Sequence, residues 1–169
     1  MPQPIRDLNH RACFNGSMPK PLHQAIAAIF LLCCLTLAAQ ENGMWRAANS
    51  TAKSITGDIA LANEKITINF LSFTMVKIRA LEKSELSAAF DADSKANGSG
   101  SLFRLDIPAS RKFLKKNSLC GAEDTEWMAT YVQGRSLQIA FFSGQKPPLL
   151  TLDALANSSD TCGTYSYVY

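Results

Sequence analysis

The chain has 169 residues, of which 47% are hydrophobic, 9% aromatic and 18% charged, and its formal net charge at pH 7 is +3. This length suits one ordinary domain with one core. The small positive charge gives no reason to expect a nucleic-acid partner.

The N-terminal part is dominated by an uncharged apolar run, Ala25 to Leu37. Lys20 precedes the run and small residues follow it, which is typical of a secretory signal peptide. The run is shorter than the ~20 residues that a bilayer-spanning helix needs, although a membrane anchor and a buried helix remain alternatives. We therefore predict a leader over residues 1–38 and a single exported domain over 39–169, periplasmic or secreted, with no stable membrane span after processing.

Met18 gives this leader an ordinary length and is a second candidate start site, the alternative being a long leader from Met1. Cys33 and Cys34 follow leucines rather than small residues, so lipid attachment is not expected. Loss of residues 1–38 removes both histidines and three of the five cysteines, and it leaves 14 basic against 13 acidic residues.

The first half of the exported part shows mainly the two-residue alternation of β-strands. Strands are predicted over Ser54–Leu61 and Lys65–Phe73, with a turn at Asn63-Glu64 and a third strand around Val76–Ala80. The segment from Ser84 to Phe90 is ambiguous between helix and strand. Residues 91–101 are rich in Asp, Asn, Gly and Ser and are predicted to form a loop.

The second half continues the alternation. Strands are predicted over Leu102–Ile107, Glu126–Val132, Ser136–Phe142 and Thr164–Tyr169, and a helix over Ala109–Lys116 after Pro108. The fold class is therefore mainly β: a small antiparallel β-barrel or sandwich of about seven or eight strands with one short helix. Pairing of the C-terminal strand with Ile55–Leu61 would remove two exposed strand edges.

Cys120 and Cys162 are the cysteines that remain after processing. In an exported chain they are most simply one disulfide, which would close a loop of about 40 residues and stabilise the fold by ~4 kcal/mol. Two unpaired buried thiols are the alternative.

The exported part contains no histidine, so neither a Ser–His–Asp triad nor a Cys–His pair is available to it. Zinc sites built on His or free Cys are excluded in the same way, and no glycine-rich phosphate loop precedes a helix. Residues 91–97 lack the glycine and the oxygen ligand that a calcium loop needs. We expect no enzyme activity, no cofactor and no metal site; hydrolysis by the acidic cluster Glu123, Asp124 and Glu126 is the least favoured function.

Two clusters of residues are candidates for binding. Trp127, Tyr131 and Phe141 would line an apolar ligand pocket if they point into a hollow barrel; plain core residues are the alternative. Four basic residues between 111 and 116 would form a basic helix face that meets an acidic partner or an anionic membrane, or simply faces solvent.

Several short motifs carry a resemblance to a known group of proteins. They are Thr56-Gly57-Asp58-Ile59, Leu119-Cys120-Gly121 followed by Trp127, Phe141-Phe142-Ser143-Gly144 with Pro147-Pro148, and Cys162-Gly163-Thr164-Tyr165-Ser166-Tyr167. With these motifs the chain resembles a family of small exported bacterial proteins of uncharacterised function. The resemblance spans most of the exported part and implies no catalytic residue.

The function expected from the sequence is a non-enzymatic exported domain that binds a small apolar ligand or an envelope component. The alternative is an inhibitor of a secreted hydrolase that acts through a loop such as Gly144–Pro148. Periplasmic barrel inhibitors of lysozyme or metalloproteases are similar in size and strand number only.

Overall fold

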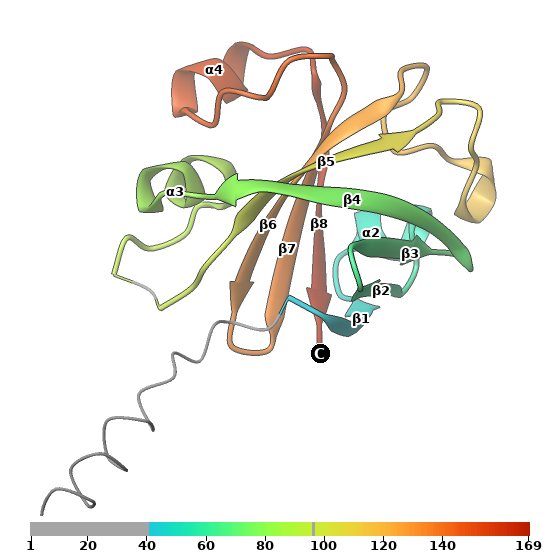
Figure 1. The fold of residues 1–169 in the computed structure, drawn as a ribbon, viewed down its shortest axis with the longest axis horizontal. Helices are drawn as coiled ribbons and strands as arrows, with labels where there is room; N and C mark the ends of the chain where they lie inside the picture. Colours follow the sequence, from blue (N-terminus) through green and yellow to red (C-terminus); the bar gives the residue numbers. More distant parts are fainter. Residues whose placement is uncertain (1–40, 96) are drawn as a thin grey trace, which may run out of the picture. The chain divides into compact units, whose positions relative to one another are not determined.

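The computed structural model describes residues 41–95 and 97–169, and the predicted leader lies outside this part of the chain. The described residues form a closed barrel of antiparallel strands that pair in sequence order, β1 to β8 (Figure 1). The strands are β1 Gly43–Ala47, β2 Ile59–Ala62, β3 Lys65–Ile68, β4 Leu71–Ala80, β5 Ser101–Ile107, β6 Thr125–Gln133, β7 Ser136–Phe142 and β8 Thr161–Val168. The mainly β fold predicted from the alternation is thus confirmed as a barrel.

The barrel is closed by β1 and β8, where Arg46 lies opposite Val168 and Ala47 opposite Tyr167. The C-terminal strand therefore does pair with the first strand, but that strand is β1 and not the predicted Ile55–Leu61. The predicted segment instead begins at the last residue of α2, Ser50–Ile55, and ends in β2, which already pairs with β1 on one side and β3 on the other. The side chain of Asn49 accepts a hydrogen bond from the amide of Ala52 and so caps this helix.

Two tight turns shape the β2–β3–β4 meander. Asn63 and Glu64 join β2 to β3, as predicted, and both have positive φ. Asn69 and Phe70 join β3 to β4 with the same positive φ values, which defines type I′ turns. This second turn divides the predicted strand Lys65–Phe73 into two strands.

The predicted single helix over Ala109–Lys116 is wrong. Only a 3-10 turn, η1 at Leu114–Lys116, forms there, and Lys115 and Lys116 have positive φ. The α-helices of the described residues are instead α2, α3 at Lys83–Phe90, which settles the ambiguous segment, and α4 at Leu152–Asn157.

The protein has two apolar clusters separated by the sheet. The interior of the barrel is filled by large side chains that include Trp45, Tyr165 and Tyr167, all with at most 1% of their surface exposed. The second cluster lies on the outer face of β5, β6 and β7, where residues of α3 and Leu150 cover it. Both faces of these central strands are therefore buried.

The sulfur atoms of Cys120 and Cys162 lie at bonding distance, and their Cα atoms are 4.7 Å apart. The predicted disulfide is therefore present, and it joins the loop before β6 to the beginning of β8. Cys162 lies where the β7–β8 pairing shifts, between the pairs Phe141–Gly163 and Phe142–Thr161.

None of the helices within residues 41–95 and 97–169 is long and apolar enough to cross a bilayer.

Candidate functional site

The residues predicted to form one pocket lie on opposite faces of the barrel wall. Trp127 pairs with Phe142, and Met128 pairs with Phe141. Trp127 and Tyr131 belong to the outer cluster, whereas Phe141 belongs to the interior cluster. Trp127 and Tyr131 do share one face of β6, as expected, but it is the outer face. The structure thus does not bring the predicted constellation together.

The interior offers little room for a ligand. Phe141 is fully buried, and its ring meets the ring of Tyr165 edge to face, with 5.3 Å between the ring centroids. The hydroxyl groups of Tyr167 and Thr56 are 2.8 Å apart, within hydrogen-bond distance. Burial raises the pKa of Tyr165 to about 12, and it raises the pKa of Tyr167 further. This is a packed apolar interior with its hydroxyl groups in the neutral form.

Trp127 connects the outer cluster to the segment between β7 and β8. Its indole Nε1 donates a hydrogen bond to the backbone oxygen of Gly144 at 3.0 Å. The guanidinium carbon of Arg104 lies 4.8 Å from the centre of the indole ring, a cation–π contact. Trp127 is therefore an anchor for the loop that begins at Gly144.

Tyr131 holds α3 against the sheet. Its ring stacks on the ring of Phe90, with 5.9 Å between centroids and 23° between planes. Its hydroxyl group donates to the side chain of Gln133. Gly98 passes so close to this ring that an added Cβ would clash with it, so only glycine fits there. Tyr131 is a packing residue of the outer cluster.

A pocket of about 590 Å³ lies between the outer face of β7 and α4, and we call it the α4 pocket. Its wall contains the ring of Phe142, the two prolines of the β7–β8 segment and apolar residues of α4. Lys146, Ser158 and Asp160 supply polar groups. The lining residues are Phe142, Ser143, Lys146, Pro147, Pro148, Leu149, Ala154, Leu155, Ser158 and Asp160. An apolar pocket with few polar groups is the usual character of a small-molecule site.

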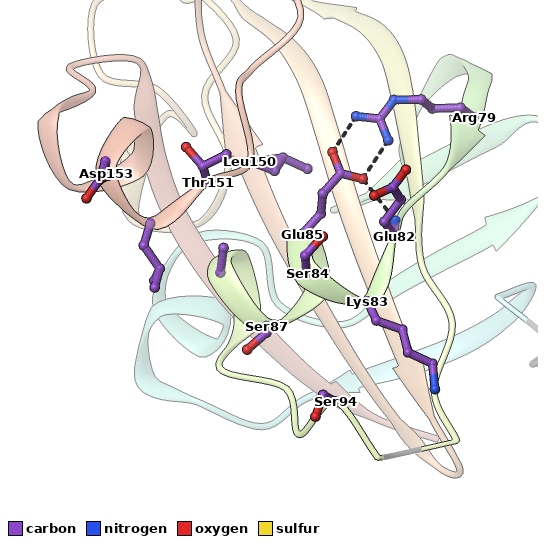
Figure 2. Close-up of a pocket in the computed structure, with 12 residues that line it drawn as sticks. Arg79, Glu82, Lys83, Ser84, Glu85, Ser87, Ser94, Leu150, Thr151 and Asp153 are labelled. Carbon is purple, nitrogen blue, oxygen red and sulfur yellow. Dashed lines mark hydrogen bonds and ion pairs between the residues drawn. The ribbon is translucent and has the colours of Figure 1, made fainter.

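A larger depression of about 980 Å³ lies between α3 and α4, and we call it the α3–α4 groove (Figure 2). Figure 2 shows α3 on one side, with Ser84 and Ser87, and the start of α4 on the other, with Thr151 and Asp153. Leu150 belongs to both the groove lining and the outer cluster. The groove is more polar than the α4 pocket, and the two depressions flank α4.

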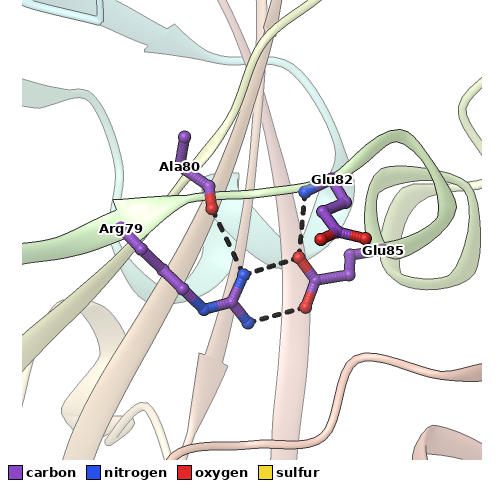
Figure 3. Close-up of polar contacts among 4 residues, drawn as sticks. All are labelled: Arg79, Ala80, Glu82 and Glu85. Carbon is purple, nitrogen blue, oxygen red and sulfur yellow. Dashed lines mark hydrogen bonds and ion pairs between the residues drawn. The ribbon is translucent and has the colours of Figure 1, made fainter.

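An ion pair between Arg79 and Glu85 belongs to the lining of the groove, and Figure 3 shows its contacts. Both terminal nitrogens of Arg79 donate to the carboxylate of Glu85, each at 2.6 Å. The same carboxylate accepts the backbone amide of Glu82, which completes a capping box at the start of α3. Hydrogen bonds from Arg79 hold the pKa of Glu85 below its usual value, although burial acts in the opposite direction. These charges are committed to α3 and are not free to bind an ion.

The α4 segment is weakly anchored. None of the α4 residues is buried, and Leu152 at its start exposes 70% of its surface. The side chain of Thr151 caps the helix by accepting from the amide of Ala154. Leu150, two residues before the first residue of the helix, is buried, with 3% exposed. Few buried contacts mark a segment that opens at low free-energy cost.

The remaining candidate residues form no joint site. The carboxylate of Asp124 accepts the amide of Ala109 at 2.7 Å, and Glu126 pairs with Arg104. Asp93 accepts the amide of Lys95 within a local turn. Within residues 41–95 and 97–169, no group of three or more acidic, Cys or His residues is arranged to hold a metal ion.

Comparison with known proteins adds no relative: the chain matches no protein-family model, no curated protein and no solved structure.

The α4 pocket was not predicted, although part of its signal is present in the sequence. Thr151 followed by Leu152 and Leu155 is the pattern of a capped helix with one apolar face. Glu82 and Glu85 have the spacing of a capping box and identify α3 in the same way. No local pattern indicates that Phe142, rather than Phe141, faces the pocket, because both residues lie in one apolar run.

Proposed function

We propose that the protein is an exported, non-enzymatic binding domain and that the α4 pocket takes a small apolar ligand or the apolar part of an envelope component. The observation that carries this proposal is a pocket of ligand size walled by Phe142, Pro148 and Leu155, beside a packed barrel interior. Small-molecule pockets typically have volumes of roughly 300–1,000 Å³. Ligand binding would thus use the outside of the barrel.

Two features favour an apolar ligand with one polar end. The floor and the α4 side of the pocket are apolar, whereas the polar residues Lys146 and Asp160 both line it. Asp160 is already engaged, since its carboxylate accepts the hydroxyl group of Ser159. In the described part of the chain, Lys146 takes part in no ion pair. Its ammonium group is therefore the available partner for a carboxylate or phosphate end.

The weak anchoring of α4 supplies a route of entry. The helix packs on the barrel through half-buried residues, and the pocket and the groove lie on its two sides. A small displacement of α4 would open the pocket without disturbing the strands. The hydrogen bond from Trp127 to Gly144 would keep the start of the segment in place.

The two alanines of α4 provide a matched test. Ala154 is half buried and lines the pocket, whereas Ala156 is exposed and does not line it. We expect Ala154→Phe to fill the pocket and weaken binding of palmitate and of the neutral dye N-phenyl-1-naphthylamine by at least about tenfold, the loss expected for an obstructed apolar contact. Ala156→Phe should bind like the wild type. Titrations would follow Trp127 fluorescence in a Trp45→Phe background.

Equal binding by both alanine variants would contradict the proposal, as would failure of the wild type to bind either probe. Thermal unfolding of both variants serves as the control for folding.

The inhibitor alternative is favoured by one observation. Leu149 follows the two prolines of the β7–β8 segment and exposes 75% of its surface, although it is apolar. An exposed apolar residue on a rigid loop is suited to insertion into the cleft of a secreted hydrolase. That function predicts a stoichiometric hydrolase partner whose binding is lost in Leu149→Ser and retained in Ala154→Phe, whereas the ligand proposal predicts that Ala154→Phe loses the probes and that no hydrolase binds.

A further inference from the structure

Phe70 has a conformation that neither packing nor backbone preference explains. It is the second residue of the two-residue turn between β3 and β4, with φ +66°. Glycine is the residue usually found there, and a bulky side chain with positive φ is uncommon. The Phe70 side chain is also 98% exposed, so it contributes no core packing. A conformation that costs stability without adding contacts points to a role outside the fold.

Other apolar residues lie near Phe70. A depression of about 420 Å³ beside the turn is lined by Phe70, by Met44 of β1 and by Leu114 of η1. Met44 exposes 68% of its surface. Leu114 packs against Gly57, where an added Cβ would lie 3.0 Å from its side chain. Phe70, Met44 and Leu114, which come from three separate segments, thus form one apolar surface.

Positive charge adjoins this apolar surface. Leu114 leads directly into Lys115 and Lys116, and the stretch from 109 to 119 has four exposed basic residues and no acidic one. Figure 1 shows the β3–β4 turn and the yellow-orange η1 segment at the same end of the barrel. In the part of the chain that the structure describes, none of these four basic residues takes part in an ion pair.

Two of the acidic residues nearby bind backbone amides. Asp58 lines the same depression, and its carboxylate accepts the amide of Ala47 at 2.9 Å. Asp124 accepts the amide of Ala109. Neither carboxylate pairs with a basic side chain, so the basic charges of residues 111–116 are available to a partner.

We propose that the surface formed by Phe70, Met44, Leu114 and the basic residues 111–116 docks on an anionic lipid bilayer. An apolar side chain that enters the acyl boundary, flanked by cations at the level of the phosphate groups, is the pattern of an interfacial anchor. A bilayer needs no fixed complementary shape, which fits a fully exposed aromatic ring beside long basic side chains. This surface shares no lining residue with the α4 pocket, so the inference does not rest on the proposed function.

The test separates docking from stability with two glycine substitutions. Phe70→Gly removes the anchor and relieves the positive φ. We expect it to raise the urea midpoint of unfolding and to weaken binding to vesicles of equal parts phosphatidylglycerol and phosphatidylcholine by at least about tenfold. Glu64→Gly relieves the same strain in the other type I′ turn. We expect it to raise the urea midpoint as well, without weakening vesicle binding.

The charges are tested on the same vesicles. Replacement of Lys115 and Lys116 by serine should weaken binding by roughly fivefold for each removed charge, and added salt should reduce the difference. The protein is purified from its host, with its N-terminus established by intact mass and the same in all variants. Vesicle binding that is unchanged in Phe70→Gly, or equal on pure phosphatidylcholine, would overturn the proposal. Binding to an acidic protein with no binding to anionic vesicles would overturn it as well.

Discussion

Tyr165 and Tyr167 place two phenolic hydroxyl groups inside a barrel whose interior is mainly apolar. Both side chains are fully buried on β8. Tyr167 has Thr56 as a hydrogen-bond partner, while Tyr165 packs on Phe141. Burial raises the pKa of both groups because a phenolate would lose its hydration inside the barrel. These two tyrosines therefore make the free energy of unfolding decrease at alkaline pH.

The direction of this dependence follows from the pKa shifts. The unfolded chain releases both phenolic protons near pH 10, whereas folded Tyr165 retains its proton to about pH 12. Stability is therefore complete below about pH 10 and falls as the pH rises, by up to about 1.4 kcal/mol per pH unit for each tyrosine. Urea unfolding between pH 9 and about 11 should show this slope. Tyr165→Phe should reduce it, and substitution of the exposed Tyr169 should not; an equal slope in both variants would contradict the account.

At the scale of elements, the β7–β8 segment and the disulfide have opposite roles. The segment carries α4 and the two pockets that flank it, and few of its residues are buried. The disulfide holds the beginning of β8 at the end of this segment, next to a shift in the β7–β8 pairing. The segment is thus held at both ends, by the Trp127 hydrogen bond at Gly144 and by the disulfide at Cys162.

The disulfide should contribute most of its stability through the unfolded state. Its cysteines are 42 positions apart, for which the chain-entropy model gives about 4 kcal/mol. We expect Cys120→Ser and Cys162→Ser to lower the free energy of unfolding by similar amounts and the double variant to lower it little further. Denaturant unfolding of the three variants measures this. Additive losses would show that the two cysteines stabilise the fold independently.

The positions of the strands could be predicted from the sequence better than the positions of the helices. Which side chains of a strand face the barrel interior was also harder to predict. Alternation correctly located β5 and β7, but residues on both faces of β6 are buried, so its sequence does not reveal which face is inside. The helix predicted at Ala109–Lys116 does not form: Phe113 is buried, and the two residues Lys115 and Lys116 have positive φ values, which an α-helix does not allow. The α4 pocket depends on α4 meeting Phe142, a contact between segments that local patterns do not encode.

At the scale of the whole described domain, the proposed binding surfaces both lie outside a filled barrel. The interior cluster joins all eight strands, so an internal ligand would have to displace core side chains. The outer face of β5, β6 and β7 has a second apolar cluster, which α3 and the β7–β8 segment cover. We propose that this covered face binds the ligand, while the end of the barrel at the β3–β4 turn meets the membrane. The barrel then serves as a rigid support for both.

The central claim, that the ligand site is the α4 pocket rather than the barrel interior, is tested most directly by NMR. Two-dimensional amide spectra of the protein would be recorded during a titration with N-phenyl-1-naphthylamine. We expect the largest shift changes in residues 142–160, with the interior-facing Tyr165 and Tyr167 little affected. Large changes at Tyr165, Tyr167 and Phe103 with little change along α4 would place the ligand inside the barrel and contradict the account.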